Sequence, residues 1–214
     1  MCHQNFIIKS LKKIIKTNII RTGAVYGKYD SLNIKKANLL GTDIGLLPSL
    51  LIGLEHPERV IKISVSDGIP FPGQKHSSWE LKGFAKKGSF VGNFMIRWFP
   101  RISTHIGYLK GFYRGYSIPK EILKEFLSDG LRETNKVAFK SYFENFHIGQ
   151  NYFAPKASEV NVPVQVVWAK QDRFINVKLA HEIADRLPNT ELEVLNKAGH
   201  YIHMDVPKRY AQVL

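Results

Sequence analysis

The sequence contains a single cysteine, Cys2, which cannot form an internal disulfide framework. Long apolar runs are absent too, because the strongest candidate, residues 46–54, is short and contains Pro48. A membrane-spanning helix needs roughly 18 apolar residues. Near the N-terminus, lysines break up the apolar segment that a secretory signal would require. We therefore expect a globular protein of the reducing cytoplasm, without a transmembrane segment.

Acidic residues are scarce, since 18 aspartates and glutamates are set against 31 lysines and arginines, giving a formal net charge of +13. Lysines and arginines that are clustered on a surface can bind the phosphates of nucleic acids. Here the cationic residues are mostly lysines that are spread along the whole chain, which is typical of a solvated surface. We expect no specific nucleic-acid partner.

Residues 5–20 combine apolar side chains at near-helical spacing with lysines on the opposite side, which predicts an amphipathic helix. Packing of its apolar face onto its own domain is favoured over binding to an anionic membrane. The apolar positions are Phe6, Ile7, Leu11, Ile14, Ile15 and Ile19.

The hydrophobic pattern alternates between strand and helix in two separate parts of the chain. Residues 37–42 predict a buried strand, 45–55 a helix and 60–67 a second strand, and the short connection makes the two strands parallel neighbours. The alternation stops near residue 70 and gives way to aromatic, glycine-broken helical segments that continue to about residue 153. It then resumes with strands at 163–169 and 190–196, a helix at 177–187, and a last helix beginning near Pro207.

The segment "GTDIG" places Asp43 between Gly41 and Gly45, after a strand and before a helix. A residue at such a tip is presented above the carboxyl edge of a parallel sheet, where open α/β folds bind ligands. We expect both glycines to be required by a strained turn and by close packing of the helix on the strand. The pattern is that of a nucleophile elbow with aspartate in place of serine. The alternative, an aspartate that forms the turn and caps the helix, is favoured slightly by these five residues alone.

Two further candidates also follow predicted strands. Asp172 in "WAKQD" comes shortly after the strand at 163–169, and His200 in "AGHYIH" comes shortly after the strand at 190–196. The chain order Asp43, Asp172, His200 is the order of nucleophile, acid and histidine in the α/β-hydrolase fold. Because the carboxyl ends of parallel strands share one edge, we expect the three side chains to converge there, with His200 bonded to Asp172 and facing Asp43.

With these motifs, residues 36–68 and 160–208 resemble the alpha/beta hydrolase superfamily, and the aspartate in the elbow resembles its epoxide hydrolase and dehalogenase branch. The resemblance implies a mostly parallel sheet flanked by helices, with core segments at 1–70 and 156–214 and a helical cap at 71–155. Members of the family normally have several strands and an HGxP-type loop before the elbow. Only 42 residues precede Asp43 here, with no HG dipeptide, so we expect an N-terminally truncated member.

The resemblance also implies a mechanism that needs no metal and no cofactor. Asp43 would attack a carbon atom to form an alkyl-enzyme ester, with the backbone N–H of Ile44 as an oxyanion donor. His200, stabilised by Asp172, would deprotonate the water that hydrolyses the ester. Dehalogenases commonly have tryptophan where this chain has Ile44, which disfavours haloalkane substrates.

Epoxide hydrolases use cap tyrosines to protonate the opening ring, and the candidates here are Tyr142, Tyr113 and Tyr116, with Tyr108 nearby. Each of them is individually more typical of cap packing than of a proton donor. Asp67, at the end of the second strand, is an alternative acid. His203 lies three residues after His200, but no third ligand accompanies the two, so a packing or supporting role is favoured over a metal site.

Three interpretations remain open: a small-molecule hydrolase of the epoxide hydrolase type, an inactive hydrolase-fold protein, and a basic protein that binds nucleic acid or membrane. Three candidate residues at strand ends favour the first over the third. If the N-terminal strands are missing, the strand at 37–42 becomes an open sheet edge, which residues 19–26 or a second copy of the chain would cover.

Overall fold

The computed structural model describes residues 30–73, 75–85, 100–115 and 118–214. The amphipathic helix predicted within residues 5–20, the covering segment at 19–26 and Tyr116 lie outside this part of the chain. Two compact units make up the chain. The first comprises residues 1–72, 145–166 and 183–191, and the second comprises residues 73–144, 167–182 and 192–214.

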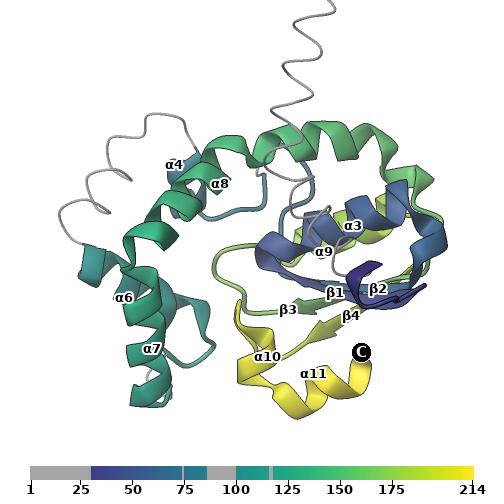
Figure 1. Cartoon of the computed structure of the whole chain (residues 1–214). Coiled ribbons are helices and arrows are strands. Elements are labelled where there is room, and N and C mark those ends of the chain that lie inside the picture. The colour runs from purple at the N-terminus through teal and green to yellow at the C-terminus, as the bar shows by residue number, and fades with distance from the viewer. Residues whose placement is uncertain (1–29, 74, 86–99, 116–117) are drawn as a thin grey trace, which may run out of the picture. The chain divides into compact units, whose positions relative to one another are not determined.

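A parallel sheet is the framework of the fold, with the strand order β1-β2-β3-β4 (Figure 1). Its strands are β1 (Ala37–Thr42), β2 (Val60–Ser66), β3 (Val164–Ala169) and β4 (Thr190–Leu195). β1 pairs with β2 in parallel, up to the pair of Thr42 with Ser66. β2 pairs with β3 in parallel from Ile63 with Val164 to Val65 with Val166. The four predicted strands and the parallel arrangement are therefore confirmed.

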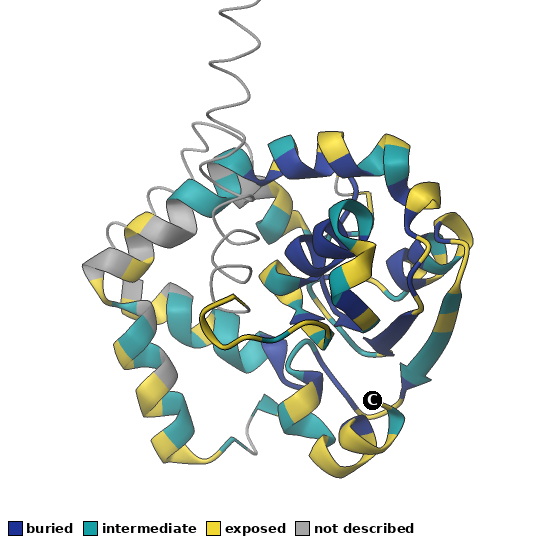
Figure 2. Cartoon of the chain, turned by 45° about the vertical axis from the view of Figure 1, so that its right-hand side comes forward, coloured by how far each residue is buried: buried dark blue, intermediate teal, exposed yellow. Residues whose placement is uncertain are grey.

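In the first unit, the helix α3 (Leu46–Glu55) packs on β1 and β2. Its first eight residues are all buried, so it is among the darkest elements of Figure 2. Contact is close because Gly53 leaves room for a neighbour: a Cβ atom there would lie 2.4 Å from Cδ1 of Ile63 and 2.9 Å from Cγ2 of Val162. A 3-10 helix at Pro57–Arg59 then leads into β2.

The end of the long helix α8 (Glu133–Phe153) also belongs to the first unit. The ring of Phe153 stacks on Phe71 at 6.0 Å between centroids, and the guanidinium of Arg186 lies 4.2 Å from the centre of the Phe71 ring. The buried side chain of Gln150 donates a hydrogen bond to the carbonyl of Ile69. These contacts anchor the segment that follows β2.

Helices dominate the second unit. Its part of the predicted insertion contains α4 (Trp79–Ala85), α6 (Pro100–Gly111), α7 (Lys120–Gly130) and the start of α8. The described residues between 71 and 155 contain helices and no named strand, while the function of this segment as a cap stays a prediction. The chain continues through the 3-10 helix Ala154–Glu159, α9 (Lys178–Arg186), α10 (Ile202–Asp205) and α11 (Pro207–Val213). The sequence predicts α9 and α11, but neither the 3-10 helix nor α10.

A backbone bridge joins the start of the insertion to the segment after β3. Ser77 and Ile175 form an isolated antiparallel bridge. Ser78 N–H donates to the carbonyl of Phe174, and Asn176 N–H donates to the carbonyl of His76. Segments far apart in the sequence are therefore held together here by main-chain groups.

The core of the second unit lies where the end of β3 meets the last strand and the C-terminal helices. Every residue of β3 is buried, as its runs of valine predict for a strand covered on both faces. Within the described residues, no helix is long and apolar enough to cross a membrane. The core cluster consists of Val167, Ala169, Leu195, Ala198, Ile202 and Tyr210.

Candidate active site

Asp43 lies directly after β1, at the start of a 3-10 helix formed by Asp43–Gly45. Its φ of 49° is in the left-handed region, which few residues other than glycine adopt without strain. Asp43 is exposed, and the N-cap residues of the 3-10 helix and of α3 are Thr42 and Gly45, neither of which makes a side-chain cap hydrogen bond. Asp43 therefore forms the turn without being the N-cap residue of either helix, and its role as a nucleophile stays a prediction.

Backbone crowding explains the turn, although not in the way the sequence predicts. A Cβ atom on Gly41 would lie 2.4 Å from Oγ of Ser49 and 2.5 Å from the Gly45 carbonyl oxygen. Gly45 itself has nothing within 4 Å of such an atom and has an ordinary φ of −83°. The crowded second glycine is Gly68, where a Cβ atom would lie 2.4 Å from the Asp43 carbonyl oxygen. The expected requirement for glycine holds for Gly41 and is wrong for Gly45.

Asp67 follows β2 as Asp43 follows β1. The two strands pair up to Thr42 and Ser66, so the aspartates come next on adjacent strands. Asp67 has nearly the same backbone conformation, with a φ of 48°, but it is only 1% exposed. One strand end therefore carries an exposed carboxylate and its neighbour a buried one.

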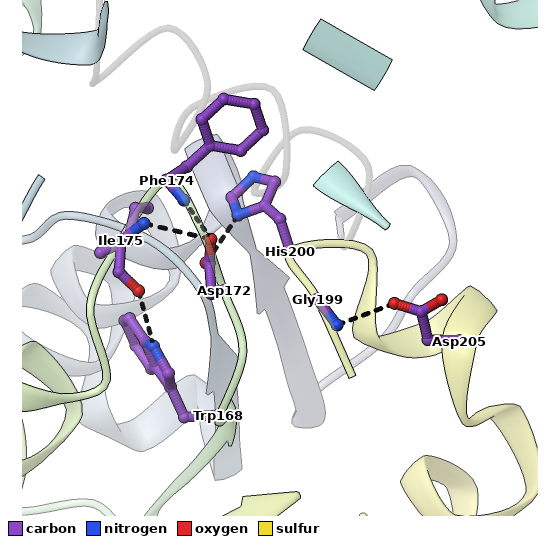
Figure 3. A network of polar contacts seen from close by, with 7 residues as sticks. All are labelled: Trp168, Asp172, Phe174, Ile175, Gly199, His200 and Asp205. Carbon is purple, nitrogen blue, oxygen red and sulfur yellow. Dashed lines mark hydrogen bonds and ion pairs between the residues drawn. The ribbon is translucent and has the colours of Figure 1, made fainter. Parts of the chain in front are cut away.

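Asp172 organises the loop after β3 with both of its carboxylate oxygens. Oδ1 accepts the backbone N–H groups of Phe174 at 2.7 Å and Ile175 at 3.1 Å. The carbonyl of Ile175 in turn accepts the indole N–H of the buried Trp168 at 3.2 Å (Figure 3). The orientation of this carboxylate is therefore set by three residues that immediately surround it in sequence.

His200 lies in the loop after β4, and its Nδ1 is 2.9 Å from Oδ2 of Asp172 (Figure 3). The side chains are 9% and 0% exposed, so this contact is almost free of competing water. Since the carboxylate is an acceptor, Nδ1 carries the proton and Nε2 is left as the basic nitrogen. This contact agrees with the expectation that Asp172 supports His200, while the alternative acid, Asp67, stays a prediction. Convergence of Asp43 with this pair stays a prediction.

The family model of the alpha/beta hydrolase fold matches residues 29–207. The chain belongs to this family. Among curated relatives, a 2-hydroxy-6-oxononadienedioate/2-hydroxy-6-oxononatrienedioate hydrolase of Paraburkholderia phymatum is 25% identical over 88% of this chain and 64% of the relative. A monoacylglycerol lipase of Bos taurus is 22% identical over 86% of this chain and 55% of the relative. The chain thus spans less than two thirds of the length of these curated relatives.

A solved structure supports the same fold. The 2-hydroxy-6-oxo-6-phenylhexa-2,4-dienoate hydrolase from Rhodococcus sp. strain RHA1 superposes with a TM-score of 0.78 at 18% identity, covering 93% of this chain and 69% of that one. At this identity the likeness establishes the fold alone. The chain therefore belongs to the predicted superfamily, and any reaction has to be argued from its own residues.

Aromatic rings surround His200. The rings of Phe174 and Tyr201 meet the His200 imidazole edge-on at 5.3 Å and 5.5 Å between centroids. Nζ of Lys110 lies 5.1 Å from the centre of the Phe174 ring, and Lys110 also forms an ion pair with Glu80. The sequence does not single out Phe174 or Tyr201, although each lies within two residues of a predicted site residue.

The Lys110–Glu80 pair changes the acidity of Glu80. Burial acts to raise the pKa of the Glu80 carboxyl, but hydrogen bonds, chiefly from Lys110, together with the charge of Lys110, outweigh it and lower the pKa. Glu80 lies on α4 and Lys110 on α6, so the ion pair connects two helices of the insertion.

The candidate tyrosines have different surroundings. Tyr113 is half-buried, and its backbone N–H donates to Asp205 at 2.8 Å. Tyr142 lies on α8 with its ring edge-on to Phe143 at 5.3 Å. Burial, aided by the charge of Asp129, raises the pKa of Tyr108. The use of any tyrosine as a proton donor stays a prediction.

His203 has an environment that favours its neutral form. Desolvation lowers its pKa, and the nearby His200 lowers it further, while Asp205 acts in the opposite direction. Its ring lies edge-on to Tyr201 at 6.5 Å. In the described part of the chain, no three residues of the types His, Cys, Asp and Glu are grouped as metal ligands would be.

Proposed function

We propose that this chain is a hydrolase of small organic molecules that uses Asp43 to form an alkyl-enzyme ester, as in epoxide hydrolases. The observation that carries the proposal is the exposed Asp43 on a left-handed turn directly after a parallel strand. In this position the family pattern has a serine nucleophile. A carboxylate presented at the carboxyl end of such a strand is placed where open α/β folds bind their ligands.

In the first half-reaction, an oxygen of the Asp43 carboxylate forms a bond to a ring carbon of an epoxide while the C–O bond of the ring breaks. A carboxylate is already an anion at neutral pH, so this attack needs no base. The ring oxygen leaves as an alkoxide and takes a proton from an acidic hydroxyl, for which Tyr113, Tyr142 and Tyr116 are the candidates.

In the second half-reaction, Nε2 of His200 accepts a proton from water, and the resulting hydroxide adds to the ester carbonyl carbon of Asp43. The backbone N–H of Ile44 stabilises the negative charge on the carbonyl oxygen. The bond between this carbonyl carbon and the alkoxy oxygen then breaks, and the leaving alkoxide takes the proton from the His200 imidazolium, which releases the diol. The carboxylic acid left on Asp43 loses its proton, which through water restores the hydroxyl that protonated the ring oxygen. Asp172 supports this step because its buried carboxylate holds Nδ1 and stabilises the imidazolium.

A second candidate is hydrolysis at a carbonyl carbon, which the names of the dienedioate hydrolase and lipase relatives favour. Attack of the Asp43 carboxylate on a carbonyl carbon would produce an anhydride rather than an ester. An anhydride is hydrolysed readily without a general base, so this route would depend far less on His200.

The decisive experiment is intact-mass and peptide mass spectrometry of the His200→Gln variant after incubation with a panel of epoxides and activated alkyl halides. We expect an adduct on the peptide containing Asp43, because formation of the ester needs no base and its hydrolysis does. His181→Gln is a matched control, since His181 is an exposed histidine on α9, and it should accumulate no adduct.

The double variant Asp43→Asn, His200→Gln should form no adduct, although its fold is retained, because Asp43 is exposed and asparagine is of nearly the same size. Turnover of the wild type in ¹⁸O-labelled water should place the label in Asp43. A folded His200→Gln sample without an adduct would favour an inactive hydrolase-fold protein. Turnover of dienedioates that survives His200→Gln would favour the second candidate.

A further inference from the structure

Asp205, at the end of the short helix α10, accepts two main-chain hydrogen bonds with a single oxygen. Its Oδ2 lies 2.8 Å from the backbone nitrogen of Gly199 and 2.8 Å from that of Tyr113 (Figure 3 shows the first bond). These donors are separated by more than eighty positions in the sequence. One belongs to the residue before His200, and the other follows the end of α6.

The backbone segments that Asp205 joins are in direct contact. A Cβ atom on Gly199 would lie 2.6 Å from the Gly111 carbonyl oxygen and 2.7 Å from the backbone nitrogen of Tyr113. Tyr201 N–H donates to the carbonyl of Gly111 at 3.2 Å. Both neighbours of His200 are therefore fixed: the one before it is hydrogen-bonded to this carboxylate, and the one after it is hydrogen-bonded to the end of α6.

Side chains reinforce the same junction. The ring of Tyr201 packs on Phe112 at 4.8 Å and on Tyr108 at 6.1 Å between centroids. A Cβ atom on Gly111 would lie 2.4 Å from the Tyr201 ring, so the end of α6 can approach only because residue 111 is glycine. Movement of this junction would therefore carry the His200 backbone with it.

We infer that Asp205 is a positioning residue that fixes the position of His200 relative to the end of α6 and therefore relative to Tyr113. The inference rests on the proposed function, in which His200 is the general base and Tyr113 a candidate proton donor. Bonds from neutral N–H groups to a carboxylate are stronger than those between neutral partners. Their loss would let the His200 backbone shift relative to Asp172 and to substrate, which weakens the His200–Asp172 bond, and a misplacement of about 1 Å can reduce a rate about a hundredfold.

The test compares Asp205→Ala, which removes both acceptor bonds, with Asp205→Asn, which keeps the shape and one acceptor oxygen. Asp185→Ala is the matched control, because Asp185 is an exposed aspartate on α9. The first readout needs no substrate: proton NMR of the Nδ1–H of His200 in its bond to Asp172, together with hydrogen exchange of the Gly199 and Tyr113 amides.

We expect Asp205→Ala to broaden or lose the His200 signal and to accelerate exchange of both amides at least about tenfold, while Asp205→Asn retains the signal. In turnover of an epoxide, Asp205→Ala should lower kcat by about tenfold to a hundredfold with little change in KM. A merely structural role would lower the melting temperature without this split.

An unchanged His200 signal and unchanged amide exchange in Asp205→Ala would overturn the inference, as would equal effects of Asp185→Ala. If Asp205→Ala does not fold, Asp205→Asn is decisive: exchange of the Tyr113 and Gly199 amides faster than in the wild type supports the inference, because a neutral amide oxygen is a weaker acceptor than a carboxylate, and unchanged exchange overturns it. Because NMR and exchange need no turnover, failure of the proposed epoxide chemistry would be recognised separately.

Discussion

The turn that carries Asp43 and the loops that carry Asp172 and His200 are built by different physical means. The turn depends on backbone proximity, because Gly41 and Gly68 admit neighbouring atoms where a side chain would collide. The loops depend on hydrogen bonds, because the Asp172 carboxylate accepts two backbone N–H groups and contacts His200. The exposed aspartate is thus held by steric contacts of the backbone, and the buried Asp172–His200 pair is held by hydrogen bonds.

This difference predicts that the two aspartates contribute unequally to stability. Asp172→Ala should lower the free energy of unfolding by about 1–3 kcal/mol, since it leaves buried donors unsatisfied. Asp43→Asn should change it by less than about 0.5 kcal/mol, because Asp43 is exposed and asparagine, of nearly the same size, also tolerates a positive φ. Urea unfolding followed by circular dichroism measures both values. Equal losses in the two variants would break the comparison.

A smaller difference in stability should distinguish substitution of Gly68, which contacts the turn, from substitution of Gly45, which lies in it. Gly68→Ala introduces a Cβ atom 2.4 Å from the Asp43 carbonyl oxygen and 2.6 Å from Leu46 Cβ, so we expect a loss of about 1–2 kcal/mol as the backbone shifts. The control, Gly45→Ala, adds an atom with nothing within 4 Å and should stay within about 0.5 kcal/mol of the wild type. Thermal unfolding of both variants checks the order, and a more damaging Gly45→Ala would show that the crowding argument is wrong.

The smallest effect concerns the ion pair of Glu80 with Lys110 beside Phe174. The pKa of Glu80 is lowered on folding, so its ionised form adds stability above its usual value of 4.5, and that stability is lost as the pH falls through the folded pKa. Glu80→Gln should therefore cost at most about 1 kcal/mol at pH 7, and this cost should shrink as the pH falls through the folded pKa. Melting temperatures across this pH range, with the exposed Glu121→Gln as a control, provide the measurement. A difference that grows towards low pH would contradict the assigned sign.

The sequence predicts the sheet well because its signals are local. The strand Val164–Ala169 is a short, wholly buried run rich in valine, and the Asp43 turn follows directly from the spacing of glycines around an acid. Asp172 and His200 were found for the same reason, since each comes shortly after a recognisable strand. A local pattern cannot show which glycine is crowded. It therefore points to Gly45, whereas in the structure Gly68, after the next strand, is the glycine that contacts the turn.

Features built from distant residues were not predicted. Asp205 contacts Tyr113 across 92 positions in sequence, and nothing in "HMDVP" indicates that its carboxylate accepts a bond from the end of another helix. The tyrosine proton donor has the same difficulty, because its identity depends on how the insertion meets the substrate. The reaction class is likewise set by one side chain, Asp43, in a fold that accommodates many chemistries.

The antiparallel bridge between Ser77 and Ile175 has a consequence for the evolution of this chain. The bridge and its neighbouring bonds use only main-chain groups, which substitutions of non-proline residues leave in place. It connects the start of the long insertion to the loop after β3, which also contains Asp172. Helices between Trp79 and the end of α8 can thus be lengthened, shortened or replaced while the entrance stays attached beside the acid.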